Sequence, residues 1–305
     1  MIHTTEVNLM SACSSALVVN GQLAATDALE KQVPWWSFTK TVLAATALTL
    51  VRDRLVGLDD PLYDGAFSLR QLLRHEAGLA DYAELADYHH AVARGDQPWP
   101  AQEMLERLDA GRLRYQPGVG WGYSNVGYLY IVRLIEERCG ATLAEAIRQR
   151  VQHPLGVPGF RLAKTPADLQ DVDMGSAASY HPGWVYHGLL VGKLSDAALW
   201  LDRLLAGNLL PAELLAEMQT RRVLGGPIPG RPWTVPGYAL GLMQGDVEGG
   251  LLLNGHSGSG PGSVIAVYCA ITENGSATCA AFQKDARDGD VEGEVVAQLR
   301  GTLLI

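Results

Sequence analysis

One stretch of the sequence, residues 41–51, is mostly apolar and carries no charged side chain. Charged residues return directly after it, at Arg52. A helix that is apolar nearly all round is usually buried. The pattern therefore predicts a helix that begins near Ser37 and runs through the core of the protein.

The rest of the pattern places strands near both ends of the chain and helices between them. Apolar and β-branched runs predict strands at residues 16–19, 22–25, 238–243, 251–253, 264–271 and 277–282. Helical patterns cover residues 101–109, 126–138, 195–205, 212–219 and 291–303, and capping boxes begin at Ser68 and Thr142. This order predicts an α+β fold, in which one antiparallel sheet is completed by both chain ends and a helical segment is inserted.

The start of the first helix holds a candidate nucleophile. Lys40 follows Ser37 by three residues, and positions i and i+3 share a helix face, which puts the amine beside the hydroxyl. Burial and the positive end of the helix both favour a neutral amine that can take a proton. A serine hydroxyl needs such a base to become a nucleophile. The alternative is that Ser37 only caps the helix.

Two further segments carry polar side chains on glycine-rich loops. The first, residues 116–128, delivers Tyr123, Ser124 and Asn125 to the start of the helix at 126–138, where Ser124 or Asn125 could simply be a cap. The second, residues 254–263, holds His256-Ser257-Gly258-Ser259 before an apolar strand. Taken alone, it could be a turn between strands.

In this order, the Ser-x-x-Lys, Tyr-Ser-Asn and His-Ser-Gly segments resemble the serine β-lactamase and penicillin-recognising hydrolase family. The similarity is greatest to its class C-like branch, which includes D-alanyl-D-alanine peptidases, D-aminopeptidases and esterases. Residues 58–61, 72–79 and 154–156 look like the same family, so that the resemblance runs from about residue 16 to the end. It implies a lobe built from residues 1–61 and 175–305, a helical lobe of residues 62–174, and an active site in the crevice between them.

The resemblance also implies a role for each motif residue. Ser37 would attack the acyl carbon, and Lys40 with Tyr123 would form a coupled base, of which either member could take the proton. Asn125 would hold Lys40 and donate its amide to the substrate carbonyl.

The third motif would bind the substrate along a strand. His256 would begin this strand, Ser257 would offer a hydroxyl to a substrate carboxylate, and Gly258 would allow close approach of the backbone. The backbone amides of Ser37 and Ser259 would form the oxyanion hole. No metal or cofactor is implied.

The third motif departs from the class C pattern, because His256 stands where those β-lactamases carry a lysine. A histidine is largely neutral at pH 7, whereas a lysine is a permanent cation suited to a carboxylate. The sequence therefore predicts a serine hydrolase acting through an acyl-enzyme on amides or esters of small substrates, including D-amino-acid peptides. The alternatives are a carboxylesterase, a weak β-lactamase, or a catalytically idle binding protein that kept the fold.

Composition limits the partners. The 305 residues are 48% hydrophobic and 19% charged, which is typical of an ordered globular protein, and the net charge of −9 argues against nucleic acid or an anionic membrane as partner. No continuous apolar run reaches the roughly 20 residues that span a bilayer. Residues 1–6 show no basic leader, which predicts a cytoplasmic protein. Its expected partner is a small-molecule or short-peptide substrate.

Several other residues invite alternative interpretations. A turn at Asn274-Gly275 would place Cys269 and Cys279 on opposite faces of the sheet, whereas a bulged turn shifted by one residue would set them opposite each other. Buried thiols are the expected state. His75 is expected to be structural, and His89-His90 a solvated pair. Six aromatic residues are expected in the core, with lining of the crevice as the alternative: Trp35, Trp36, Trp121, Tyr180, Trp184 and Tyr186.

Overall fold

The computed structural model describes residues 13–26, 31–63, 65–177 and 179–304. The prediction that the chain has no leader rests on residues 1–6, which lie outside the described residues. The strands are β1 Ser14–Val19, β2 Gln22–Thr26, β3 Val33–Pro34, β4 Pro61–Leu62, β5 Phe67–Ser68, β6 Arg161–Ala163, β7 Leu189–Gly192, β8 Arg222–Val223, β9 Trp233–Tyr238, β10 Met243–Val247, β11 Leu252–Gly260, β12 Ser263–Thr272 and β13 Gly275–Lys284. The α-helices are α1 Thr39–Arg52, α2 Leu69–Leu73, α3 Ala86–Arg94, α4 Ala101–Arg107, α5 Asn125–Cys139, α6 Leu143–Ile147, α7 His153–Leu155, α8 Leu194–Leu205, α9 Ala212–Met218 and α10 Asp288–Leu303.

The main sheet joins the two ends of the chain. In the described residues it has eight strands in the order β2-β1-β13-β12-β11-β10-β9-β8, and all its neighbouring pairs are antiparallel. Strand β1 pairs with β13 along its whole length, from Ser14 opposite Phe282 to Val19 opposite Ala277. The predicted α+β fold with a sheet completed by both ends is therefore confirmed. The lobe boundaries at residues 62 and 174 stay a prediction.

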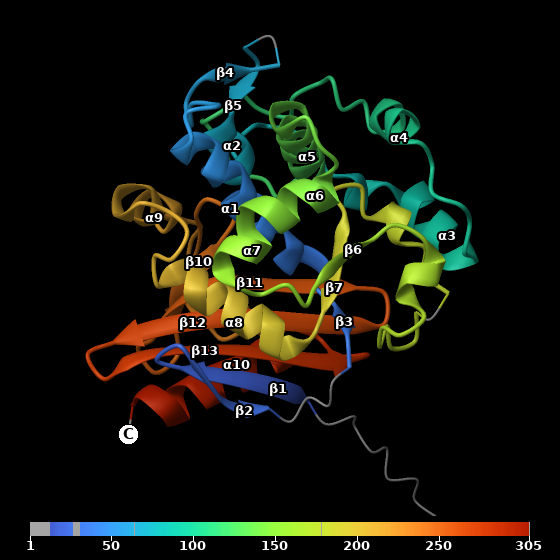
Figure 1. Cartoon of the computed structure of the whole chain (residues 1–305). Helices are drawn as coiled ribbons and strands as arrows, with labels where there is room; N and C mark the ends of the chain where they lie inside the picture. Colours follow the sequence, from blue (N-terminus) through green and yellow to red (C-terminus); the bar gives the residue numbers. More distant parts are fainter. Residues whose placement is uncertain (1–12, 27–30, 64, 178, 305) are drawn as a thin grey trace, which may run out of the picture.

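Helices cover both faces of this sheet (Figure 1). Successive residues of a strand point to opposite faces, and in β12 Val267 packs into the core that contains α1 and α8, whereas Tyr268 packs against α10. The alternation buries both faces, which explains why β12 reads as a nearly continuous apolar run rather than an alternating one.

Helix α1 lies in the middle of the molecule, as its apolar sequence predicts. Every residue from Thr39 to Leu50 is buried. The hydroxyl groups inside this helix are satisfied locally or by the sheet, since Thr46 donates to the Val42 carbonyl at 2.8 Å and Thr41 donates to the Gly241 carbonyl at 2.8 Å. The burial of α1 fixes where its first turn, and therefore Ser37, lies.

Local signals predicted several elements closely. Helix α5 is capped by Ser124, whose hydroxyl accepts from the Gly127 amide at 3.1 Å, and ends at Gly140 with a φ of 59°. The capping boxes at Ser68 and Thr142 are both present.

Two predictions were wrong, and one helix was not predicted. The strand expected over residues 238–243 is instead a turn at residues 239–242, flanked by Tyr238 at the end of β9 and Met243 at the start of β10. Residues 86–94, to which no element was assigned, form helix α3. The β12–β13 turn lies at residues 273–274, one position earlier than expected, and pairs Thr272 with Gly275.

The two cysteines of this hairpin remain on opposite faces of the sheet. Cys269 lies opposite Thr278 and belongs to the core around α1, while Cys279 lies opposite Tyr268 and faces α10. No disulfide joins these two described residues, as expected.

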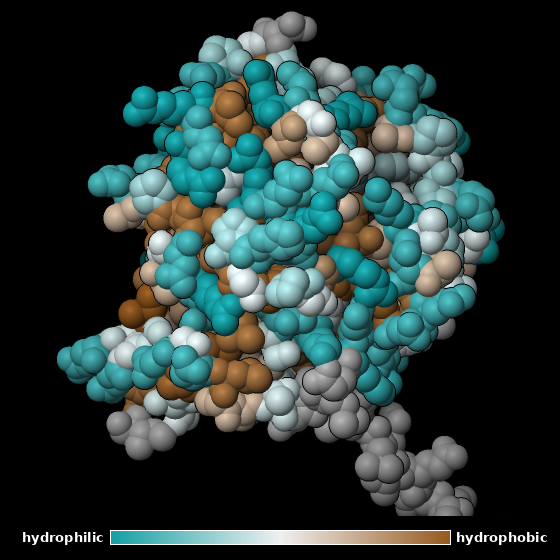
Figure 2. Space-filling model, viewed as in Figure 1, coloured by the Kyte–Doolittle hydropathy of each residue, from teal (hydrophilic) through white to brown (hydrophobic). Residues whose placement is uncertain are grey.

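The face seen in Figure 2 is mainly hydrophilic, and hydrophobic side chains show only in small breaks between polar ones. This is the usual consequence of placing the apolar residues in a core. Within the described ranges, no helix is both long and apolar enough to cross a membrane.

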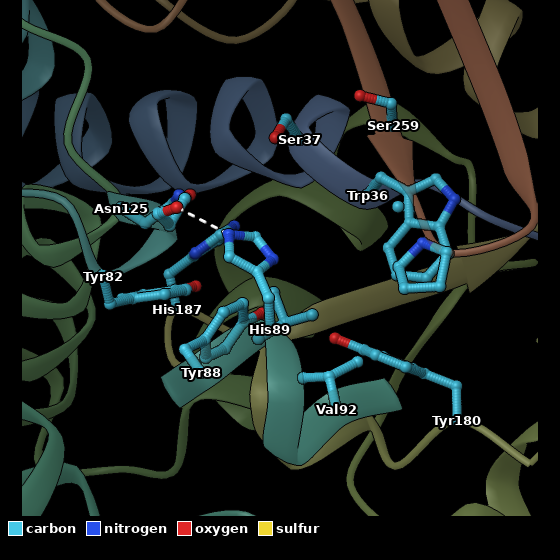
Figure 3. Close-up of a pocket in the computed structure, with 14 residues that line it drawn as sticks. Trp36, Ser37, Tyr82, Tyr88, His89, Val92, Asn125, Tyr180, His187 and Ser259 are labelled. Carbon is cyan, nitrogen blue, oxygen red and sulfur yellow. Dashed lines mark hydrogen bonds between the residues drawn. The ribbon is translucent and has the colours of Figure 1, made fainter. Parts of the chain in front are cut away.

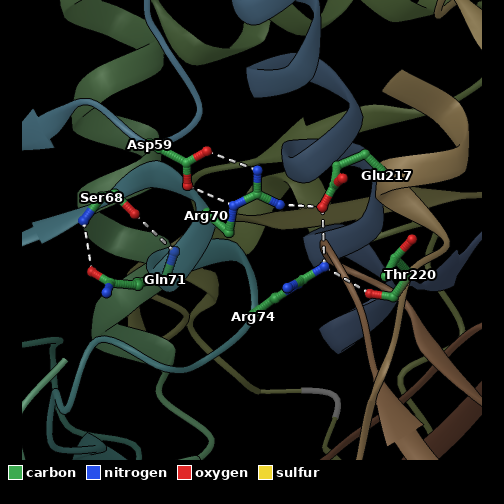
Figure 4. A network of polar contacts seen from close by, with 7 residues as sticks. All are labelled: Asp59, Ser68, Arg70, Gln71, Arg74, Glu217 and Thr220. Atoms are coloured by element: carbon green, nitrogen blue, oxygen red, sulfur yellow. Dashed lines mark hydrogen bonds and ion pairs between the residues drawn. The ribbon is translucent and has the colours of Figure 1, made fainter. Parts of the chain in front are cut away.

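A network of charged side chains ties α9 to α2 (Figure 4). Glu217 of α9 accepts from Arg70 and, at 3.2 Å, from Arg74, and Arg70 also forms a two-bond pair with Asp59 at 2.6 and 2.8 Å. The Arg74 side chain is only 15% exposed, so this network is less screened by solvent than a lone surface pair. It fixes the loop that follows α9 beside the sheet.

We expect Glu217→Gln to lower the free energy of unfolding by about 1 kcal/mol, because two guanidinium groups lose a charged acceptor. Urea denaturation of the variant and the wild type measures this difference. Glu213→Gln, an exposed position of the same helix, is the matched control and should change stability by much less. Equal stability of all three proteins would contradict the role given to the network.

Candidate active site

Ser37 lies in a tight turn that precedes α1. Residues Trp36–Phe38 form a single 3₁₀ turn, and Thr39 continues directly into the helix. Trp36 has a φ of 39°, a left-handed conformation that is strained for a bulky residue. Its indole donates to the Ser263 hydroxyl at 3.1 Å, which anchors the turn to β12. The turn leaves the Ser37 side chain half-buried at the edge of a cavity.

Lys40 is fully buried and has three polar neighbours. Its Nζ lies 3.2 Å from Ser37 Oγ, 2.7 Å from Asn125 Oδ1 and 3.1 Å from His187 Nε2. Burial lowers the pKa of the Lys40 amine to about 7, although the nearby Asp81 carboxylate opposes this shift. The predicted neighbour pair of Ser37 and Lys40 is therefore present, and near neutral pH the amine can take a proton.

Asn125, the first residue of α5, links Lys40 to Asp81. Its Nδ2 donates to both Asp81 oxygens, at 2.9 and 3.2 Å, and a carboxylate only accepts, so Oδ1 must face Lys40. Asn125 thus holds Lys40 as expected. The amide that was expected to bind the substrate carbonyl is instead engaged by Asp81, a residue that the sequence analysis did not single out.

Tyr123 lies beside the same pair. Burial raises the pKa of its phenol far above the ordinary value, although the nearby Ser37 side chain opposes this shift. The Lys40 Nζ lies 5.0 Å from the centre of the Tyr123 ring. His75 packs on the other side, with ring centres 4.3 Å apart, and its Nδ1 accepts from the Ser124 amide at 3.1 Å. His75 thus supports the loop that carries Tyr123, and its structural role stays a prediction.

The third motif lies on β11, next to the Ser37 turn. Strand β10 pairs with residues 252–255 of β11 only, so among the described residues the edge from His256 onward faces the cavity. Gly258 permits a close approach, since a Cβ atom there would lie 2.5 Å from the Ser37 nitrogen. The geometry brings Ser259 to the same cavity as Ser37.

His256 is buried and uncharged. Its Nε2 lies 3.0 Å from the Tyr238 hydroxyl, and burial lowers the pKa of the imidazole to about 3. Ser257 accepts from the Arg231 guanidinium at 3.1 Å. Arg231 is itself paired with Glu292 of α10, which is fully buried. Arg231 is a second residue that the sequence analysis missed, because 26 positions separate it from Ser257, which it contacts.

Two cavities meet at Ser37. Both are lined by Ser37, Ala83, Asn125 and Ser259. The larger, of about 390 Å³, adds polar side chains on the side of Tyr123: Arg231, His256, Ser257 and Asp288. The smaller, of about 200 Å³, is mostly aromatic and apolar (Figure 3): Trp36, Tyr82, Tyr88, Val92, Tyr180 and Val185.

The aromatic residues expected in the core divide between two places. Trp36 and Tyr180 line the smaller cavity and Trp121 the larger one, whereas Trp35 and Trp184 are buried in the core. Tyr186 packs against the core and donates to the Trp99 carbonyl at 3.1 Å.

The histidine pair at 89–90 is exposed as expected, but His89 also lines the smaller cavity and bonds the Ala83 carbonyl at 2.7 Å. His187, the third residue missed, lies in the loop before β7 and lines the smaller cavity. The described residues contain no cluster of three or more histidine, cysteine or acidic side chains suited to a metal ion.

Comparison with known proteins identifies a family and relatives for this chain. A family model described as Beta-lactamase matches residues 17–300. D-aminopeptidase of Brucella ovis is 26% identical over 254 residues, which cover 78% of this chain and 47% of that protein. D-aminopeptidase of Brucella anthropi is 28% identical over 246 residues, covering 75% and 45%. The chain spans about half the length of these curated relatives.

Solved structures share the fold across nearly the whole chain. D-amino acid amidase from Ochrobactrum anthropi SV3 superposes with a TM-score of 0.79 at 22% identity, covering 96% of both chains. D-stereospecific amidohydrolase from Streptomyces sp. superposes with a TM-score of 0.77 at 22% identity, covering 95% of this chain and 94% of that one. At this level of identity the likeness concerns the fold.

We expect Gly258→Ala to slow covalent labelling of Ser37 by a fluorophosphonate by about 10-fold or more. The new Cβ would push the Ser37 backbone amide out of the position from which it can donate a hydrogen bond to an oxyanion. Mass spectrometry of the labelled peptide over time gives the rate. Gly293→Ala is the matched control, since a Cβ there meets open space. Unchanged labelling of the Gly258 variant would show that this close approach does not matter for reactivity.

Proposed function

The chain belongs to the beta-lactamase family, and we propose that it is a serine hydrolase that cleaves amide or ester bonds of small substrates through an acyl-enzyme at Ser37. The observation that carries this proposal is the fully buried Lys40 amine, 3.2 Å from Ser37 Oγ and with a pKa lowered to about 7. Such an amine is neutral in a large fraction of molecules at pH 7, and a neutral amine can deprotonate the serine.

Acylation then proceeds with Lys40 as the first proton acceptor. Ser37 Oγ bonds to the substrate carbonyl carbon while its proton moves to the Lys40 amine, and the carbonyl oxygen becomes an oxyanion. The backbone amides of Ser37 and Ser259 stabilise this oxyanion. The raised pKa of Tyr123 argues against a resting phenolate, which favours Lys40 over Tyr123 as the base.

Tyr123 serves as the relay to the leaving group. When the tetrahedral intermediate collapses, the bond to the leaving nitrogen or oxygen breaks, and that atom takes the Tyr123 proton. The Lys40 ammonium then returns a proton to Tyr123. In deacylation the oxygen of a water bonds to the acyl carbon, and the water proton passes to Tyr123 as the Tyr123 proton passes to Lys40. The bond between the acyl carbon and Ser37 Oγ then breaks, Lys40 returns the proton to Ser37 Oγ, and the acid is released.

This relay assigns the two cavities. Tyr123 lines the larger cavity and is not among the residues that line the smaller one, so the leaving group occupies the larger cavity. The acyl group occupies the smaller one, whose described lining is aromatic and carries no acidic or basic side chain other than two histidines. We therefore propose substrates with an apolar acyl side chain.

The relatives named D-aminopeptidase, which this chain matches over about half their length, favour D-amino-acid amides and short peptides within this class. A neutral His256 at the third motif favours neutral leaving groups over the carboxylate of a cephalosporin. A carboxylesterase or a weak β-lactamase would use the same acyl-enzyme mechanism. A catalytically idle binding protein would not, and substitution of Ser37 distinguishes it from the three kinds of hydrolase.

We expect a fluorophosphonate to add one phosphonyl mass to the peptide that contains Ser37, and Ser37→Ala to lower turnover of a chromogenic ester by about 10³-fold or more. The substrates to compare are p-nitrophenyl acetate, D- and L-phenylalanine p-nitroanilide, and a chromogenic cephalosporin. Ser124→Ala should keep its label, because Ser124 caps α5. A label on Ser124 or Ser257, or no turnover and no label in the wild type, would overturn the proposal.

We expect kcat/KM for a neutral ester to fall as the pH drops through about 7, because protonation of Lys40 removes its lone pair. Above that pH the rate should reach a plateau. Burial holds the pKa values of His75, His187 and His256 well below their usual range, so no other base near Ser37 explains a midpoint there. A pH–rate profile measures the midpoint, and a value below about pH 5 would point to a carboxylate instead.

A further inference from the structure

His187 is a buried residue of the loop before β7 that touches Lys40 but belongs to none of the three motifs. It is 2% exposed, and its Nε2 lies 3.1 Å from Lys40 Nζ. Its Nδ1 has no hydrogen-bond partner among the described residues. A buried imidazole in direct contact with the base needs a functional explanation, because an imidazole that only filled space would leave two polar atoms buried without use.

The neighbours of Lys40 restrict what this contact can be. Asn125 Oδ1 can only accept, since Asp81 fixes the orientation of its amide. When Lys40 takes the proton of Ser37 it becomes an ammonium, which has no lone pair and can only donate. Every atom that touches the ammonium must therefore accept, and His187 Nε2 can do so only if the proton of the neutral ring is on Nδ1.

We propose that His187 is a positioning residue for Lys40. The Nε2 atom of His187 accepts a hydrogen bond from the Lys40 amine and thereby orients the lone pair of Lys40 Nζ toward Ser37. In the neutral amine, Asn125 and His187 take the two N–H groups and the lone pair points at the serine hydroxyl. In the ammonium, the same two acceptors stabilise the charge that develops during acylation. This inference rests on the proposed acyl-enzyme function.

The wider surroundings of Lys40 do not replace this acceptor. A carboxylate and two phenol rings face the amine: Asp81, Tyr123 and Tyr128. The ring centres of Tyr123 and Tyr128 lie 5.0 and 5.6 Å from Lys40 Nζ. Three neutral histidines also surround it: His75, His187 and His256. Asp81 acts through Asn125. Of the other two histidines, His75 bonds the Ser124 amide through Nδ1. His256 bonds the Tyr238 hydroxyl through Nε2 and the Ser257 carbonyl through Nδ1. In the described structure, His187 is the imidazole within hydrogen-bond distance of Lys40.

The test compares two variants at this position with the wild type. His187→Leu keeps an apolar side chain of similar bulk but removes the acceptor. His187→Gln places an amide oxygen where Nε2 lies and can accept the same bond. We expect the leucine variant to lose about 10- to 100-fold in kcat for a neutral ester, as for a lost bond to a charged group, and the glutamine variant to recover most of that loss.

The pH profile separates positioning from packing. Loss of an acceptor destabilises the ammonium more than the amine, so the acid limb of kcat/KM should move to lower pH in His187→Leu and return toward the wild-type midpoint in His187→Gln. A merely structural role would lower the fraction of folded enzyme and leave the midpoint unchanged. A role confined to the acyl group would change KM and spare both kcat and the midpoint. Either of these last two results would overturn the inference.

A spectroscopic measurement needs no turnover. In protein labelled with ¹⁵N-histidine, the signals that disappear in His187→Gln identify this ring, and their shifts and couplings tell which nitrogen carries the proton. We expect Nδ1–H at a pH below the acid limb, where Lys40 is an ammonium. Nε2–H under these conditions would overturn the inference even if the ester assay were silent. Wild-type enzyme without Ser37-dependent turnover would instead overturn the proposed function.

Discussion

The buried amine of Lys40 is the constraint on which the rest of the structure depends. An ammonium would be the ordinary state of a lysine, and lowering its pKa from 10.5 to about 7 by burial corresponds to roughly 5 kcal/mol of lost stability at or below pH 7. Since the unfolded chain keeps the proton up to a higher pH, this loss shrinks as the pH rises from about 7 toward 10.5. A fold that places an amine here needs a large and well-packed core around it.

Helix α1 supplies that core because it is buried from Thr39 to Leu50. The sheet contributes through close backbone approaches: a Cβ at Gly241 would lie 2.2 Å from the Ala44 Cβ, and one at Gly258 would lie 2.5 Å from the Ser37 nitrogen. These two glycines let β11 and the β9–β10 turn contact the first turns of α1 directly. The strained Trp36 lies against Gly258 and is bonded to Ser263 of β12. The position of the nucleophile is therefore set by packing over the whole sheet and not by the local turn alone.

The sequence predicted those parts of this arrangement that local physics determines. The apolar run gave helix α1, a serine cap and a glycine stop gave α5, and the i, i+3 spacing put Lys40 beside Ser37. Sequence reasoning failed where contacts between distant segments decide. Residues 238–243 have the composition of a strand, but packing against α1 bends them into a turn at Gly241, which has a φ of 75°. Asp81, His187 and Arg231 could not be found from spacing, because each meets its partner only after folding.

Charge balance explains why a histidine is compatible with this third motif. Lys40 and Asp81 offset each other across Asn125, and Arg231 is matched by Glu292. His256 is close enough for the charge of Lys40 to lower its pKa. A fixed cation at position 256 would therefore lower the pKa of Lys40 further, which would make the amine a weaker base. A neutral His256 leaves the pKa of Lys40 to burial and Asp81 alone. The cleft then keeps a base that titrates near neutral pH, but position 256 offers no cation to bind a carboxylate on the leaving group.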